Sequence, residues 1–183
     1  MTERLRLAGR GRLPNGDLIT WSVAEGARGR RWRWVHTTQQ GALGVSGLVE
    51  LLPDGRFGRL ELAASGGLLT FHPVEDGRSA HGNIVTADAV LPIATTWQPE
   101  WGVGIVDDPF GSAIAEWRGT GLVVTWRRGD LVWREPGRHA DVDASPLDDR
   151  GVPQLDDATE WPLEEEEPLR ETNVGNVWTS LVN

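Results

Sequence analysis

The chain has 183 residues, of which 39% are hydrophobic and 25% charged, a composition that suits one soluble domain with an appendage. It contains no cysteine, which excludes disulfides and thiolate chemistry, and no lysine, which excludes Schiff-base catalysis and a P-loop. No apolar run approaches the ~20 residues of a membrane-spanning helix. No apolar block follows the arginines at the N-terminus, so we expect a cytoplasmic protein without a secretory signal.

The formal net charge of −9 is unevenly distributed along the chain. Residues 1–140 carry 16 arginines against 15 acids, whereas residues 141–183 carry 2 arginines against 12 acids. This asymmetry predicts a nearly neutral domain over 1–140 and an acidic, proline-containing, largely irregular tail over 141–183.

The body of the chain is patterned as short strands separated by turn residues. Arg31-Trp32-Arg33-Trp34 alternates, which predicts that Trp32 and Trp34 share one face while Arg31, Arg33 and Val35 share the other. Gly44 and Gly47 predict a bulge or bend within one strand. Pro92 predicts that its strand lies at an edge.

Turn sequences recur every eight to twelve residues, as in sandwiches and barrels. The clearest are Pro53-Asp54-Gly55, Ser65-Gly66-Gly67 and Glu75-Asp76-Gly77. We therefore predict an all-β, antiparallel meander of about ten short strands, closed into a barrel or bent into a strongly curved sheet. The expected strands are Leu18–Val23, Arg31–His36, Leu43–Leu52, Arg56–Ala63, Leu68–His72, His81–Thr86, Ala89–Trp97, Trp101–Val106, Ala113–Arg118, Leu122–Arg127 and Leu131–Arg134.

The acidic tail ends in a short apolar segment, Asn173–Asn183. Val174, Val177, Trp178 and Leu181 follow the i, i+3, i+4, i+7 spacing of an amphipathic helical turn. Trp178, Leu181 and Val182 are therefore candidate docking residues. Their partner is a different protein, a twin subunit or the body of the same chain, where the acidic linker can lie over arginines.

Ten tryptophans and no tyrosine make the aromatic content unusual. Tryptophan offers a large apolar face and one N–H donor, which suits apolar chains and sugar rings. The leading hypothesis is a non-catalytic β module that holds an apolar or glycolipid-like molecule in a tryptophan-lined cavity; the alternative for each tryptophan is packing in the core. The candidate ligand-binding residues are Trp32, Trp34, His72, His81, Trp97, Trp101 and Trp117, with Trp126 and Trp133 as further candidates.

Two other classes of function remain open at this point. One is an interaction or cargo protein that docks through its C-terminal peptide. The other is a small β enzyme with His72 or His81 as acid–base, since these histidines face each other across a predicted hairpin. Asp107 or Asp108 would complete a two-histidine metal site, but the spacing matches no ligand signature, so we expect neither metal nor cofactor. The acidic tail disfavours nucleic acid as a partner.

Overall fold

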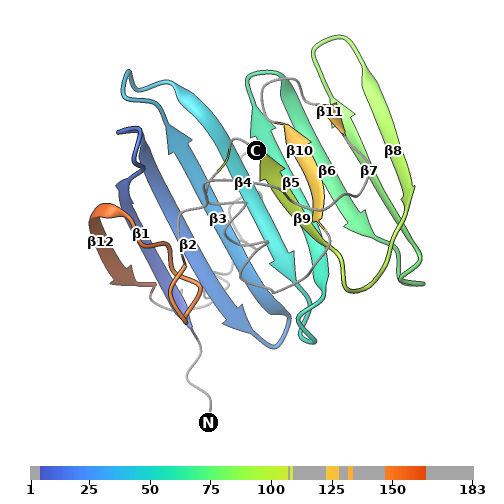
Figure 1. Cartoon of the computed structure of the whole chain (residues 1–183), viewed down its shortest axis with the longest axis horizontal. Coiled ribbons are helices and arrows are strands. Elements are labelled where there is room, and N and C mark those ends of the chain that lie inside the picture. The colour runs from blue at the N-terminus through green and yellow to red at the C-terminus, as the bar shows by residue number, and fades with distance from the viewer. Residues whose placement is uncertain (1–4, 107, 109–122, 128–131, 134–146, 164–183) are drawn as a thin grey trace, which may run out of the picture.

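The computed structural model describes residues 5–106, 108, 123–127, 132–133 and 147–163, and every regular element among them is a β-strand. Nine strands form one sheet in the order β12-β1-β2-β3-β4-β5-β6-β7-β8, and β11-β10-β9 form a second, smaller sheet. Figure 1 shows the large sheet as a sequential meander. The strands are β1 (Arg6–Arg12), β2 (Leu18–Gly26), β3 (Gly29–Thr37), β4 (Leu43–Leu51), β5 (Phe57–Ala64), β6 (Gly67–Pro73), β7 (Ser79–Val85), β8 (Val90–Thr96), β9 (Gly102–Val106), β10 (Val123–Arg127), β11 (Val132–Trp133) and β12 (Asp156–Pro162).

The predicted turns join consecutive antiparallel strands. At Pro53-Asp54-Gly55 the Leu52 N–H donates to the Arg56 carbonyl at 2.8 Å, and Gly55 has φ +81°, a left-handed conformation that glycine adopts without strain. Gly77 plays the same part in the β6–β7 turn, with φ +65°. The antiparallel meander is thereby confirmed for β1 to β8.

The predicted alternation in β3 is also confirmed. Trp32 and Trp34 are buried on one face of the sheet, while Arg33 and Val35 are exposed on the other. The predicted bulge lies at Gly44, because the pairing register with β3 shifts between Val45 and Leu43. Pro92 lies in β8, an edge strand of the large sheet, as expected.

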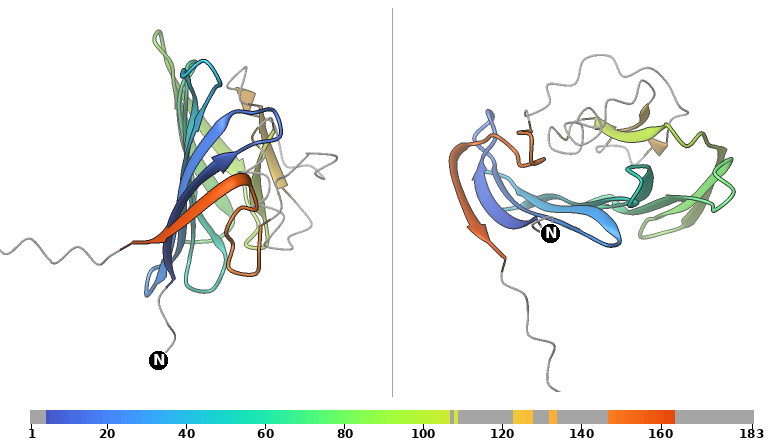
Figure 2. Two further views of the ribbon diagram at one scale, coloured as in Figure 1. Left: turned by 90° about the vertical axis from the view of Figure 1, so that its left-hand side faces the viewer. Right: turned by 90° about the horizontal axis from the view of Figure 1, so that it is seen from below.

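The barrel alternative is wrong, because the large sheet stays open. Its end strands, β12 and β8, do not pair with each other. Seen from below, the sheet curves around β9 and β10, which lie across its concave side (Figure 2). The inner face is filled by these strands, so it is buried without closure of the sheet on itself.

The expectation of a largely irregular tail fails for Asp156–Pro162. These residues form β12, which pairs antiparallel with β1 from Leu7↔Pro162 to Arg12↔Asp156. Acidic composition lowers the apolar area available for burial, but backbone pairing with an open edge satisfies the hydrogen bonds of a polar strand. The boundary drawn at residue 141 from charge thus falls before a strand of the sheet.

The second correction concerns β9 and β10, which pair in parallel from Gly102↔Val123 to Val106↔Arg127. A purely antiparallel meander was expected there. Parallel neighbours need a crossover connection, which a count of turn residues does not reveal. The expected strand Ala113–Arg118 lies outside the described residues.

The core lies between the large sheet and the elements on its concave side. Phe57, Phe71, Trp97 and Trp101 form a continuous aromatic cluster there, with ring centroids 5.4 Å apart for Phe71 and Trp97 and 5.6 Å apart for Trp97 and Trp101. The last two pairs meet edge to face, a favoured geometry for aromatic rings.

Candidate functional site

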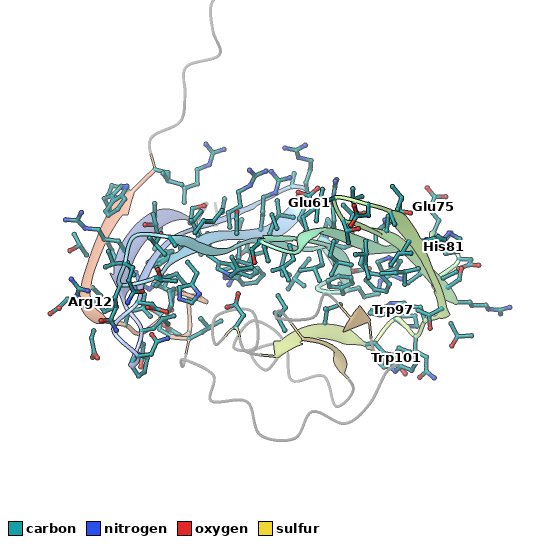
Figure 3. All side chains as sticks on the ribbon, turned by 90° about the horizontal axis from the view of Figure 1, so that it is seen from above. Arg12, Glu61, Glu75, His81, Trp97 and Trp101 are labelled. Atoms are coloured by element: carbon teal, nitrogen blue, oxygen red, sulfur yellow. The ribbon has the colours of Figure 1, made fainter. Side chains whose placement is uncertain are left out.

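The two faces of the large sheet have different surroundings. Trp97 and Trp101 point to the side where β9 lies, and Glu61 lies on the opposite side (Figure 3). We call the first side the inner face and the second the outer face. The inner face carries the core, so binding surfaces are sought on the outer face.

The predicted ligand-binding tryptophans lie in the core. Trp32, Trp34, Trp97 and Trp101 are 0%, 1%, 4% and 8% exposed, respectively. Trp32 donates its indole N–H to the Gly151 carbonyl at 2.8 Å, and Trp34 donates to the Asp108 carboxylate at 2.9 Å. All four tryptophans are packed within the protein, and Trp32 and Trp34 are also hydrogen-bonded there. Trp117 and the side chains of Trp126 and Trp133 lie outside the described residues.

His72 and His81 lie on the other side of the sheet. They are direct partners in the β6–β7 pairing, as the hairpin predicted, and both are exposed. Asp108 is buried on the inner face beside Trp34, so the sheet separates it from the two histidines. Asp107 lies outside the described residues. Across the described part of the chain, no three His, Asp or Glu side chains gather as a metal site.

A partly buried hydrogen bond that the sequence did not suggest joins His36 to Asp17. The distance between His36 Nε2 and Asp17 Oδ2 is 2.8 Å, and His36 is 3% exposed. Burial raises the pKa of Asp17, but hydrogen bonds from His36 and from the Gln39 N–H outweigh it, so the pKa lies below its ordinary value. The contact ties the β1–β2 turn to the end of β3, and the Gln39 N–H ties the same turn to the β3–β4 loop, which is a structural role.

The outer face holds a groove of about 510 Å³, which runs across the middle of the sheet. We call it the outer groove. Its apolar lining includes Val35, Leu68 and Trp161, which are 39%, 40% and 39% exposed. Arg33 and Glu61 add charge beside them. A concave apolar surface with a few polar groups has the character of a small-molecule site.

Strand β12 brings Trp161 to this groove, because Trp161 pairs with Ala8 in the register with β1. The loop before β12 is anchored on the inner face. Trp32 Nε1 and Arg30 Nη1 donate to the carbonyls of Gly151 and Arg150, at 2.8 and 2.9 Å. Sequence reasoning missed Trp161 because its neighbours are acidic; the alternation of Thr159 and Trp161 was the available indication.

A second hollow, of about 820 Å³, lies at the β2–β3 hairpin. We call it the arginine hollow. Four arginines and two glutamates line it, together with Leu163, which also lines the outer groove. Glu25 accepts a 2.9 Å hydrogen bond from Arg30 Nε, and Glu50 pairs with Arg31. The four arginines are Arg6, Arg28, Arg30 and Arg31.

No protein-family profile, curated protein or solved structure matches this chain. Among the described residues, no helix is long and apolar enough to span a membrane. The candidate docking residues Trp178, Leu181 and Val182 lie outside the described residues.

Proposed function

We propose that the protein is a non-catalytic binding module that holds an apolar or glycolipid-like molecule in the outer groove. The observation that carries the proposal is that Val35 of β3, Leu68 of β6 and Trp161 of β12 are exposed and line one concave surface. Isolated exposed apolar residues are common on proteins, but a grouped set in a hollow is characteristic of a binding surface.

The lining suggests how such a ligand would lie. An apolar chain would cover Val35, Leu48, Ala63 and Leu68, which lie on neighbouring strands of the outer face. The indole of Trp161 offers a flat apolar face for a sugar ring or a further part of the chain. Arg33 would donate hydrogen bonds to hydroxyl or other polar groups of the ligand. Of the interior tryptophans, Trp21 and Trp34 also line the groove, although they are only 3% and 1% exposed.

Nile red, a neutral apolar dye, provides the test in the full-length protein. We expect saturable fluorescence enhancement, reversed by monomeric octyl glucoside but not by glucose. Leu68→Gln should weaken dye binding about five- to tenfold, since it replaces part of the apolar floor with an amide.

Leu43→Gln is the matched control, because Leu43 is also an exposed leucine but does not line the groove. Unchanged dye binding in both variants, or equal loss in both, contradicts the assignment to the outer groove. Retention of an apolar molecule by protein purified from its own host, measured by native mass spectrometry, would identify the natural ligand class.

A further inference from the structure

We propose that residues 164–183 of this chain dock on the body of the same chain, across the arginine hollow and the outer groove. Glu164–Glu167 lie against the arginine hollow, and the apolar segment Val174–Val182 occupies the outer groove. This inference goes beyond the proposed function, because it concerns an intramolecular contact and requires no small molecule.

The position of Leu163 is the first argument. The Leu163 N–H donates to the Arg6 carbonyl at 3.0 Å, so the chain is fixed at β1 when it reaches this residue. Leu163 lines both the arginine hollow and the outer groove. Adjacent Cα atoms are ~3.8 Å apart, so Glu164 begins beside both surfaces.

Charge is the second argument. Among the described residues that line the hollow, four arginines outnumber two glutamates. Arg28 and Arg33 are exposed, and no carboxylate among the described residues pairs with either. The docking segment, residues 164–183, begins with four consecutive glutamates and carries five glutamates against one arginine in all. The charges of the two surfaces are therefore complementary.

The apolar residues provide the third argument. Val174, Val177, Trp178 and Leu181 can share one side of a helical turn, and the groove offers apolar side chains of matching character. Val174 lies ten positions after Glu164, and an extended chain of this length spans up to about 35 Å. The groove starts at Leu163, so this reach is ample.

The covalent connection of residues 164–183 to β12 favours this segment over other occupants of the groove. A short flexible linker gives its end an effective concentration in the millimolar range at a neighbouring site. A second copy or a separate protein must match that concentration to compete. Single exposed ion pairs contribute only about 0.2–1 kcal/mol each, but a tethered segment needs little affinity to remain bound.

The absence of cysteine allows a direct test in the full-length protein. One variant combines Thr20→Cys, on an exposed lining residue of the groove, with Ser180→Cys in the tail. The control combines Asp88→Cys, in the exposed β7–β8 turn, with Ser180→Cys. We expect bismaleimidoethane to link the groove pair within one chain about ten times faster than the control pair.

The contribution of charge to docking is tested in the variant that carries Thr20→Cys and Ser180→Cys. Arg28→Glu should slow the groove crosslink, whereas Arg78→Glu, at an exposed arginine in the β6–β7 turn, should not. Raising NaCl to about 1 M should also slow it, because the screening length falls to about 3 Å. Equal rates for the groove and control pairs overturn the proposal. So does a groove crosslink found only between two chains, since the tail would then occupy a second copy.

The crosslink rates are measured without dye, but a docked tail would lower the affinity of the full-length protein for Nile red. The proposed function is therefore judged in a variant with Glu164–Glu167 replaced by glutamine. No dye binding in that variant, together with a fast groove crosslink, rejects the proposed function and keeps the docked tail. Dye binding together with equal crosslink rates rejects only the tail.

Discussion

The indole of Trp34 lies directly across Gly47 on the neighbouring strand, so that a Cβ atom at Gly47 would overlap the ring. Trp21 covers Gly9 in the same way. Each of these two rings is thus accommodated by a residue without a side chain on the adjacent strand. An aromatic ring that covers a cross-strand glycine is a known stabilising arrangement in sheets.

Gly47→Ala should therefore destabilise the protein. The added methyl group must displace Trp34 from its packed position, and overpacking of this kind costs about 1–3 kcal/mol. Urea denaturation measures the change in the free energy of unfolding. Gly26→Ala is the control, because a Cβ atom at Gly26 meets nothing within 4 Å. Equal stability of the two variants contradicts the close contact between Trp34 and Gly47.

The hydrogen bond from Trp34 to Asp108 leads to a second prediction about stability. Trp34→Phe removes the donor and leaves a buried carboxylate with one hydrogen bond fewer. No described residue accepts a hydrogen bond from the buried indole N–H of Trp21, so Trp21→Phe loses ring area alone. We expect Trp34→Phe to cost about 1–3 kcal/mol more than Trp21→Phe in thermal or urea unfolding. A smaller cost for Trp34→Phe would show that this hydrogen bond does not stabilise the fold.

The lowered pKa of Asp17 makes a prediction about pH. The charged carboxylate is favoured in the folded state, so its contribution is complete above the ordinary value of 3.8 and is lost as pH falls below it through the folded-state pKa. Asp17→Asn should therefore lower stability at pH 7, and its difference from the wild type should shrink toward pH 2. Asp88→Asn, an exposed carboxylate in a turn, is the control. A constant difference at all pH values contradicts the role of the charged Asp17.

The docked tail should compete with ligand. Replacement of Glu164–Glu167 by glutamine removes the charges that hold the tail at the arginine hollow, and Nile red should then bind more tightly. A tail docked in roughly nine molecules of ten lowers the apparent affinity about tenfold. The control neutralises four exposed acids elsewhere: Glu75, Asp88, Glu100 and Asp149. A similar increase in Nile red affinity in the control variant would assign the effect to net charge.

Much of the large sheet could be predicted because its hairpins are local. Turn residues such as Asp54 and Gly55 determine where strands end, and alternation assigns Trp32 and Arg33 to opposite faces. The pairing of β12 with β1 depends on which strand edge stays unpaired, and no local pattern encodes that. The parallel pairing of β9 with β10 escaped prediction for the same reason.

The candidate site was predicted less well than the fold. Tryptophan serves a packed core and a ligand surface equally, and composition does not separate the two uses. The exposed position of Val35 followed from the alternation in β3, but the exposed Leu68 and Trp161 that share the groove come from β6 and β12. The outer groove depends on the order of strands in the sheet, which one strand's sequence does not contain.

The pairing of β1 with β12 also has a consequence for synthesis on the ribosome. Each hairpin from β1 to β8 joins neighbours in sequence, so the meander can form strand by strand as the chain emerges. The free edge of β1 is different, because its partner ends at Pro162 and is made about 150 residues later. During that interval β1 presents unpaired N–H and C=O groups. Until β12 is made, the nascent protein therefore exposes at β1 an edge that can pair with another chain.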